Sequence, residues 1–117
     1  IKDMELEVGD SKLTYNTSQQ TVVIEGSMRL ANLSEYEVVG DFLNKISEQA
    51  NDHLTIDVRN LQFLNSSGIT TFSMFILACK KQGKPKLTVL GSNDISWQEK
   101  SLRNFKKLWD DVEVEVS

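Results

Sequence analysis

Hydrophobic and polar residues alternate at the start of the chain, over residues 4–8 and again over 13–15. This is typical of a half-buried strand, which continues or restarts after Gly9. Residues 21–25 are rich in β-branched side chains and are followed by Gly26, which predicts a second strand. Because only a short polar loop separates these strands, we expect an antiparallel hairpin at the N-terminal end of the chain.

Three later stretches repeat their hydrophobic residues at the spacing of an α-helix. The first begins at Ser34, which stands three residues before Glu37 as in a capping box. The second begins within 65–68 and ends at Gly83, and the third covers about 96–109. The residues predicted to face the core are Val38, Val39, Phe42, Leu43, Ile46 and Ala50 in the first helix, Ile69, Phe72, Phe75, Ile76 and Cys79 in the second, and Trp97, Leu102, Phe105, Leu108 and Trp109 in the third.

Further strands alternate with these helices. Residues 54–58 predict a buried strand that turns through 59–64 into the second helix, and 87–90 and 112–116 predict two more, the last at a sheet edge. The element order is then β-β-α-β-α-β-α-β. It predicts an α/β fold with a mixed sheet, in which the hairpin is followed by right-handed parallel crossovers and the helices pack on the sheet. The length fits a single domain over residues 1–117.

The net charge of −4 and the pI near 5.0 argue against nucleic acid as the main partner, because phosphate neutralisation requires clustered Lys and Arg. The basic group Arg103, Lys106 and Lys107 lies in the third predicted helix near acidic residues and is interpreted as a solvated face. The single cysteine, Cys79, excludes an internal disulfide and is expected to be a buried, inert thiol. No apolar run reaches membrane-spanning length and no secretory signal is visible, so we expect a cytoplasmic protein without membrane insertion.

Residue patterns that carry catalysis or hold metals are not found. His53 is the one histidine and is expected in a loop, with no second histidine to share a metal. Ser66 and Ser67 lack the G-x-S-x-G pattern of a nucleophile elbow, and no glycine-rich phosphate loop with a lysine is present. We therefore expect no enzymatic activity, no metal and no cofactor.

The stretch 54–81 carries the candidate chemistry, because a buried strand leads into a serine-rich helix start, Asn65-Ser66-Ser67-Gly68. The first amides of a helix have no partner within the helix, and their dipoles favour negative charge. This position suits a capping hydroxyl, a bound anion or a phosphorylated hydroxyl. The simplest interpretation of Ser66 or Ser67, taken alone, is a plain N-cap.

This stretch resembles the core motif of STAS domains, the family of bacterial anti-sigma factor antagonists. The resemblance is carried by Ile56-Asp57-Val58, by Leu61 and Phe63, and by Asn65-Ser66-Ser67-Gly68-Ile69, and the predicted order of elements matches the family over most of the chain. The family pattern is a strand ending in an acidic or amide residue, an apolar pair, and Asp-Ser-Ser-Gly-Leu opening a helix. The chain departs from it at Asn65, where Asp is usual, and at Arg29, where sporulation-type antagonists tend to carry an acid.

The resemblance implies that Ser66 corresponds to the serine that a partner serine kinase, often the anti-sigma factor itself, phosphorylates. The chain would then be a non-catalytic module that binds its partner until a phosphate on Ser66 disfavours the complex. Two different functions stay open. One is a STAS subunit that regulates a transporter or a lipid-transport ATPase, and the other is a sensor of a small molecule or nucleotide that uses the amides near Ser66.

The second predicted helix also carries apolar residues away from its core face, namely Met74 and Leu77. Apolar residues displaced in this way are typical of a partner surface, unless another element covers them. The residues predicted to contact a partner are Asn65, Ser67, Gly68, Thr70, Met74 and Leu77. Arg29 is expected to pair with a phosphate on Ser66 if its loop lies beside the start of this helix.

Overall fold

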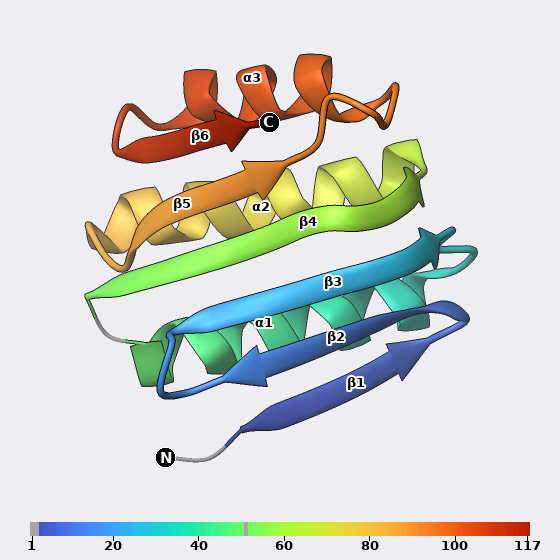
Figure 1. Ribbon diagram of the computed structural model, residues 1–117. Coiled ribbons are helices and arrows are strands. Elements are labelled where there is room, and N and C mark those ends of the chain that lie inside the picture. The colour runs from blue at the N-terminus through green and yellow to red at the C-terminus, as the bar shows by residue number, and fades with distance from the viewer. Residues whose placement is uncertain (1–2, 51) are drawn as a thin grey trace.

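Figure 1 shows the computed structural model of the protein, which describes residues 3–50 and 52–117 as a six-stranded sheet with three helices. The strands lie side by side in the order of the sequence, from β1 to β6. The elements are β1 (Met4–Val8), β2 (Asp10–Asn16), β3 (Thr21–Met28), α1 (Leu33–Ala50), β4 (His53–Leu64), α2 (Ser66–Gln82), β5 (Lys86–Gly91), α3 (Gln98–Leu108) and β6 (Val112–Val116). The predicted α/β class, the mixed sheet and the edge position of the last strand are confirmed.

The N-terminal part of the sheet contains two antiparallel hairpins, where the predicted order had one. The pairing of β1 with β2 extends to Val8, which lies opposite Ser11, and Gly9 lies in the tight turn between the strands with a φ of 56°. Glycine adopts this left-handed conformation without steric cost, so the strand restarts after Gly9 and the predicted order was one strand short. β3 runs past Gly26, where a Cβ atom would lie 2.2 Å from the carbonyl oxygen of Asp10.

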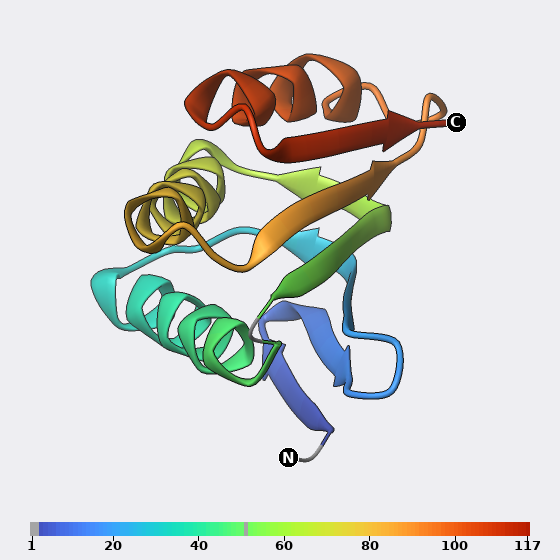
Figure 2. The same ribbon diagram turned by 90° about the vertical axis from the view of Figure 1, so that its left-hand side faces the viewer.

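All three helices of the described chain cover the same face of the sheet, as Figure 2 shows. The parallel strands β3 to β6 advance in one direction across the sheet, and a helix joins each strand to the next. Right-handed crossovers that advance in one direction place every helix on the same face. α1 and α2 are therefore neighbours, and the core lies between the helices and the face of the sheet that they cover.

The start of α1 differs from the prediction by two residues. The side-chain oxygen of Asn32 accepts the amide of Glu35 at 3.0 Å, and the Glu35 carboxylate accepts the amide of Ala31 at 2.8 Å. The capping pair is thus Asn32 with Glu35, which has the same spacing as Ser34 with Glu37. The residues predicted to face the core from α1 are buried, with the exception of Val38, which is 42% exposed. Val39 lies about 100° further round the helix and faces the core instead.

β4 continues where the sequence predicted a turn over 59–64. Its register against β3 slips twice, between Val23 and Glu25 and between Gly26 and Ser27, so β4 holds extra residues there. The fully buried side chain of Gln98 donates to the carbonyls of Val58 at 2.6 Å and Leu61 at 3.1 Å. The irregular part of β4 is therefore supported from α3, through contacts remote in sequence.

Two smaller differences concern the ends of elements. His53 is the first residue of β4, not part of a loop, and its Nε2 atom lies 3.0 Å from the hydroxyl of Thr88 on β5. α3 begins at Gln98, two residues later than predicted. Gly83 ends α2 with a φ of 77°, as predicted. In the part of the chain that the structure describes, no helix has the length and apolar character needed to cross a membrane.

Candidate functional site

Asn65 fixes the start of α2. Its backbone is extended, with φ −77° and ψ 172°, and its Oδ1 atom accepts the amide of Gly68 at 2.9 Å. Its Nδ2 atom donates to the carbonyl of Leu30 at 3.1 Å, and its own amide donates to the carbonyl of Met28 at 3.2 Å. Asn65 is the N-cap in place of either serine of the motif, and it ties the loop after β3 to the helix start.

Ser66 is the first residue of α2 and is exposed. Its hydroxyl has no hydrogen-bond partner among the described residues, and its carbonyl accepts the hydroxyl of Thr70 at 3.0 Å. The amides of Gly68 and Ile69 are both used by Asn65, through its side chain and its carbonyl, each at 2.9 Å. Within the described residues, only the amides of Ser66 and its neighbour Ser67 are left free at this helix start.

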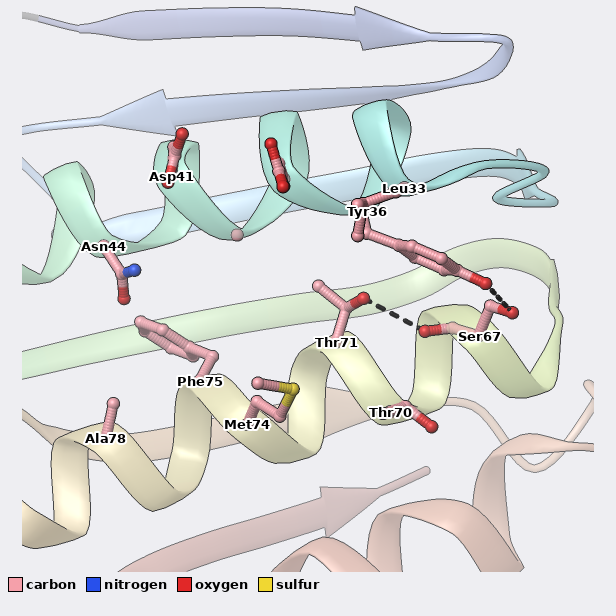
Figure 3. Close-up of a pocket in the computed structure, with 12 residues that line it drawn as sticks. Leu33, Tyr36, Asp41, Asn44, Ser67, Thr70, Thr71, Met74, Phe75 and Ala78 are labelled. Carbon is pink, nitrogen blue, oxygen red and sulfur yellow. Dashed lines mark hydrogen bonds between the residues drawn. The ribbon is translucent and has the colours of Figure 1, made fainter.

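The hydroxyl of Ser67 is held by α1. The Tyr36 hydroxyl donates a hydrogen bond to the Ser67 Oγ atom, and Figure 3 shows the tyrosine ring reaching from α1 to the first turn of α2. Ser67 is half-buried, and its carbonyl accepts the hydroxyl of Thr71 at 3.0 Å. Of the two adjacent serines, Ser66 therefore presents the free and accessible hydroxyl.

Arg29 lies in the loop that Asn65 holds beside α2. Its guanidinium carbon stands 4.1 Å from the centre of the Phe63 ring, an arrangement that favours a cation–π interaction. Phe63 precedes Ser66 by three residues at the end of β4. The loop that carries Arg29 lies beside the start of α2, as the predicted pairing of Arg29 with a phosphate on Ser66 requires. In the unmodified protein the guanidinium of Arg29 stacks on Phe63.

The exposed line of α2, which we call the α2 ridge, consists of Thr70, Met74, Leu77 and Lys81. These residues are spaced three and four apart and therefore lie along one side of the helix. Met74 is 66% exposed and Leu77 is 44% exposed. Adjacent exposed apolar side chains of this size are typical of an interaction surface.

Gly68 is the one predicted contact residue that the structure buries. A Cβ atom at this position would lie 2.3 Å from Cδ1 of Leu64. Gly68 thus permits α2 to pack closely on the end of β4, and Asn65 caps the helix from a half-buried position. Gly68 and Asn65 therefore shape the start of α2, whereas Ser66, Thr70, Met74 and Leu77 are exposed on the helix.

A groove of about 550 Å³ lies between α1 and α2 (Figure 3). Its lining residues are Leu33, Tyr36, Glu37, Gly40, Asp41 and Asn44 from α1, and Ser67, Thr70, Thr71, Met74, Phe75 and Ala78 from α2. The side chains of Thr71 and Phe75 point from α2 towards α1, and the hydrogen bond between Tyr36 and Ser67 spans the helices near their first turns. The groove therefore adjoins the serine motif directly.

Asp57 and Cys79 are two titratable residues outside the groove lining whose pKa values are shifted. On β4, Asp57 forms an ion pair with Arg59, with 2.8 Å between carboxylate and guanidinium. Burial raises the pKa of Asp57, but the hydrogen bonds and charge of Arg59 outweigh that effect and hold this pKa below its usual value. Burial raises the pKa of the Cys79 thiol to about 11, which keeps it protonated at neutral pH. The described residues contain no cluster of side chains suited to hold a metal ion.

The α1 wall of the groove was not predicted from the sequence. Its residues Leu33, Tyr36, Gly40 and Asp41 belong to no recognisable motif. Right-handed crossovers alone did not place α1 beside α2, because the order of the strands across the sheet was not predicted. Which residues of each helix meet across the interface depends on helix rotation and spacing, which the hydrophobic pattern fixes only to within a residue or two.

Comparison with known proteins gives a structural likeness only: no protein-family model and no curated protein matches the chain. SiaC of Pseudomonas aeruginosa has a similar fold, with a TM-score of 0.70 and 14% sequence identity over 100% of this chain and 97% of that chain. The crystal structure of apo-SiaC gives a TM-score of 0.72, also at 14% identity, over 100% of this chain and 99% of that chain.

A third similar chain comes from the crystal structure of the diguanylate cyclase SiaD in complex with its activator SiaC, from the same organism. The TM-score is 0.66 and the identity 13%, over 98% of this chain and 100% of that chain. At this level of identity, the likeness shows that the fold is shared along the whole chain.

Proposed function

We propose that the protein is a non-enzymatic regulatory module of the bacterial cytoplasm, which binds a partner protein through the α2 ridge and is switched by phosphorylation of Ser66. The observation that carries this proposal is the position of Ser66. Its exposed, unbonded hydroxyl lies at the first residue of α2, one helical turn before Thr70 and two before Met74. A phosphate there would add about 1.5 to 2 negative charges beside the ridge.

The choice of Ser66 over Ser67 has a structural basis. A kinase must reach the hydroxyl of its substrate, and the Ser67 hydroxyl is engaged by Tyr36 in a half-buried position. Ser66 has no such restraint. This assignment agrees with the resemblance to STAS domains, in which the same serine of the motif is the modified one.

Two classes of partner follow from different observations. The STAS-like motif favours a serine kinase of the anti-sigma factor type, which would both bind the module and phosphorylate it. The fold shared with SiaC favours direct regulation of an enzyme, since SiaC is described as the activator of the diguanylate cyclase SiaD. In both cases the module acts by binding, and the phosphate on Ser66 decides whether it binds.

A sensor function and a transport function have less support at this site. A nucleotide or small-molecule sensor that uses the free amides near Ser66 would need a pocket there, and the groove is lined by Ser67, not Ser66. A subunit of a transport ATPase would present the same α2 ridge to a different protein. Identification of the captured partner separates that case from a kinase or a cyclase.

The test compares the protein carrying phosphoserine at position 66 with the unmodified protein as baits in lysate of the source organism. We expect a partner that the unmodified protein retains and the phosphorylated protein loses. Retention of the same proteins by both baits would overturn the switch. Ser67→Ala is the matched control, and it should retain the partner because its hydroxyl is not the modified group.

Substitutions on α2 test the surface independently of phosphate. Met74→Asp and Leu77→Asp should abolish capture of that partner while circular dichroism shows a folded domain, since both side chains are exposed. Phe72→Asp should unfold the domain, because the Phe72 side chain is buried and a buried unpaired charge is strongly destabilising. Full capture by both exposed-site variants would place the binding surface elsewhere.

A further inference from the structure

Gly40 lies in the middle of α1, where glycine is unfavourable. A glycine inside a helix costs about 0.5–1 kcal/mol relative to alanine. Glycine at such a position usually permits close approach of a neighbouring element, but a Cβ atom built at Gly40 meets nothing within 4 Å, and its φ is not positive. Neither the packing nor the backbone of the described chain requires this glycine, and its open side faces the groove.

Large apolar side chains stand exposed on both walls of the same groove. Leu33, on α1, is 68% exposed, and Met74, on α2, is 66% exposed. Phe75 and Ala78 from α2 also line the groove. From Ser67 to Ala78 the α2 wall measures roughly 16 Å, or three helical turns. The groove thus has the apolar lining and the length to receive about three turns of another helix.

Two acidic side chains give the α1 wall of the groove negative charge. Glu37 and Asp41 both line the groove, four residues apart, and neither has an ion-pair partner among the described residues. Lys45 stands one turn further along α1, outside the groove lining, and makes no ion pair with Asp41. In Figure 3 the Asp41 carboxylate points away from α2, so this acid lies on the outer rim of the wall.

We propose that this groove receives an amphipathic α-helix of the partner protein, with apolar residues on its buried face and Lys or Arg along the flank that meets Glu37 and Asp41. The inference rests on the proposed function in that α2 supplies one wall. An extended strand is not suited to the groove, because both walls are helices and offer no unpaired backbone edge. A helix needs only side-chain contacts, and the space beside Gly40 admits one of its apolar anchors.

The test uses two synthetic helical peptides with the purified, unmodified protein. Both carry leucine at positions i, i+4, i+7 and i+11, and they differ only in whether lysine or glutamate flanks that stripe. We expect the lysine peptide to bind and to shift the backbone amide NMR signals of α1 and α2 along the groove. Equal binding of the two peptides, no binding of the lysine peptide, or shifts confined to other surfaces would overturn the proposal.

Variants of α1 locate the peptide without altering Ser66 or α2. Gly40→Trp should fill the groove and weaken binding at least about tenfold, while Gly40→Ala, with its small side chain, should bind nearly as well as the wild type. Glu37→Gln combined with Asp41→Asn should weaken binding roughly two- to tenfold, with the loss reduced at high salt. Wild-type affinity in both Gly40→Trp and the double variant would overturn helix docking in this groove.

The two proposals fail separately. If the lysine peptide does not bind while partner capture still depends on Ser66 and Met74, helix docking is wrong and the phosphate switch stands. If the peptide binds the groove while phosphorylation of Ser66 leaves partner capture unchanged, the switch is wrong and the docking site stands. Circular dichroism of each α1 variant confirms its fold, and the peptide shifts on the wild-type protein decide the docking site without any variant.

Discussion

The Tyr36 hydroxyl on α1 donates a hydrogen bond to the hydroxyl of Ser67 on α2, next to the exposed Ser66. This bond joins two helices through residues that are 31 positions apart in sequence and engages one of the two serines in the motif. It also lies beside the groove, so the serine motif and the α1 wall share one contact.

Tyr36→Phe and Ser67→Ala should each destabilise the protein by about 1 kcal/mol, because each removes one partner of the same half-buried hydrogen bond. The double variant should be little worse than either single variant. Urea unfolding of all four proteins gives the coupling energy, expected at about 0.5–1.5 kcal/mol. Strict additivity would show that the bond contributes nothing to stability.

Substitutions at Asn65 should separate its two roles. Asn65→Ala loses the bond to the Gly68 amide and the bond to the Leu30 carbonyl, and we expect a loss of about 1–2 kcal/mol. Asn65→Asp keeps an acceptor for Gly68 and adds a favourable charge at the helix start, but it cannot donate to Leu30. Asn65→Asp should therefore lower the free energy of unfolding by less than Asn65→Ala does.

Denaturant unfolding of the two Asn65 variants ranks them directly. Equal loss in both would mean that the bond to Leu30 dominates, since the aspartate retains everything else. A more stable Asn65→Asp than wild type would show that the bond to the Leu30 carbonyl stabilises the protein by less than the added charge at the helix start.

Two glycines of the helices should respond oppositely to alanine. Gly68→Ala places its Cβ 2.3 Å from Cδ1 of the buried Leu64 side chain, so overpacking should cost about 1–3 kcal/mol. Gly40→Ala meets nothing within 4 Å and should stabilise the protein by about 0.5–1 kcal/mol. Thermal unfolding midpoints measure both, and destabilisation by Gly40→Ala would disprove the open space inferred beside α1.

Asp57 should make stability fall on acidification. Its pKa in the folded protein is below the value of about 3.9 expected for an unfolded chain, because Arg59 outweighs the effect of burial. Below about pH 5 the unfolded chain takes up this proton first, so the stabilisation present above that pH is lost as the pH falls through the folded-state pKa. Unfolding free energies measured from pH 6 to pH 3 should fall less steeply for Asp57→Asn than for the wild type.

Arg59→Gln tests the same ion pair from the side of its cation and complements Asp57→Asn. Without the guanidinium, burial is left as the main influence, and the pKa of Asp57 should rise above its usual value. The contribution of Asp57 would then reverse in sign, and acidification would relieve the cost of a buried charge. An unchanged pH dependence in both variants would show that this ion pair is not coupled to folding.

Several features of the fold were predictable because they depend on local pattern. The alternation in the strands, the cap at Gly83 and the serine-rich start of α2 identify the elements and the motif. The continuation of β4 past Val58 was not predictable, because the exposed pair Arg59 and Asn60 is typical of a turn. The carbonyls of Val58 and Leu61 accept hydrogen bonds from Gln98, some forty residues away in sequence.

The site follows the same division. Ser66, Met74 and Leu77 could be proposed from the motif and the helical spacing, since each depends on α2 alone. The capping role of Asn65 was missed because serine and asparagine are equally good N-caps. Asn65 is favoured by its hydrogen bond to the Leu30 carbonyl, which is 35 residues away in sequence. Tyr36 and Gly40 were missed because their roles arise where α1 and α2 face each other.

Phosphorylation of Ser66 should leave the stability of the domain almost unchanged. The Ser66 hydroxyl makes no capping bond that a phosphate would break, since Asn65 caps the helix. Because the Gly68 and Ile69 amides already have partners, the phosphate gains chiefly from the helix dipole, by about 0.3–1 kcal/mol. Thermal unfolding of the Ser66 phosphoprotein should therefore show a midpoint equal to or slightly above that of the unmodified protein.

Phosphoserine placed at position 67 provides the contrast. There the added group would displace the hydrogen bond from Tyr36 in a half-buried position, and the unfolding midpoint should fall clearly. Amide NMR shifts in the Ser66 phosphoprotein should stay confined to the first turn of α2 and the loop around Arg29. A large fall in its midpoint, with shifts spread over the sheet, would mean that the modification acts by disrupting the domain, and a switch that works through the surface would have to be abandoned.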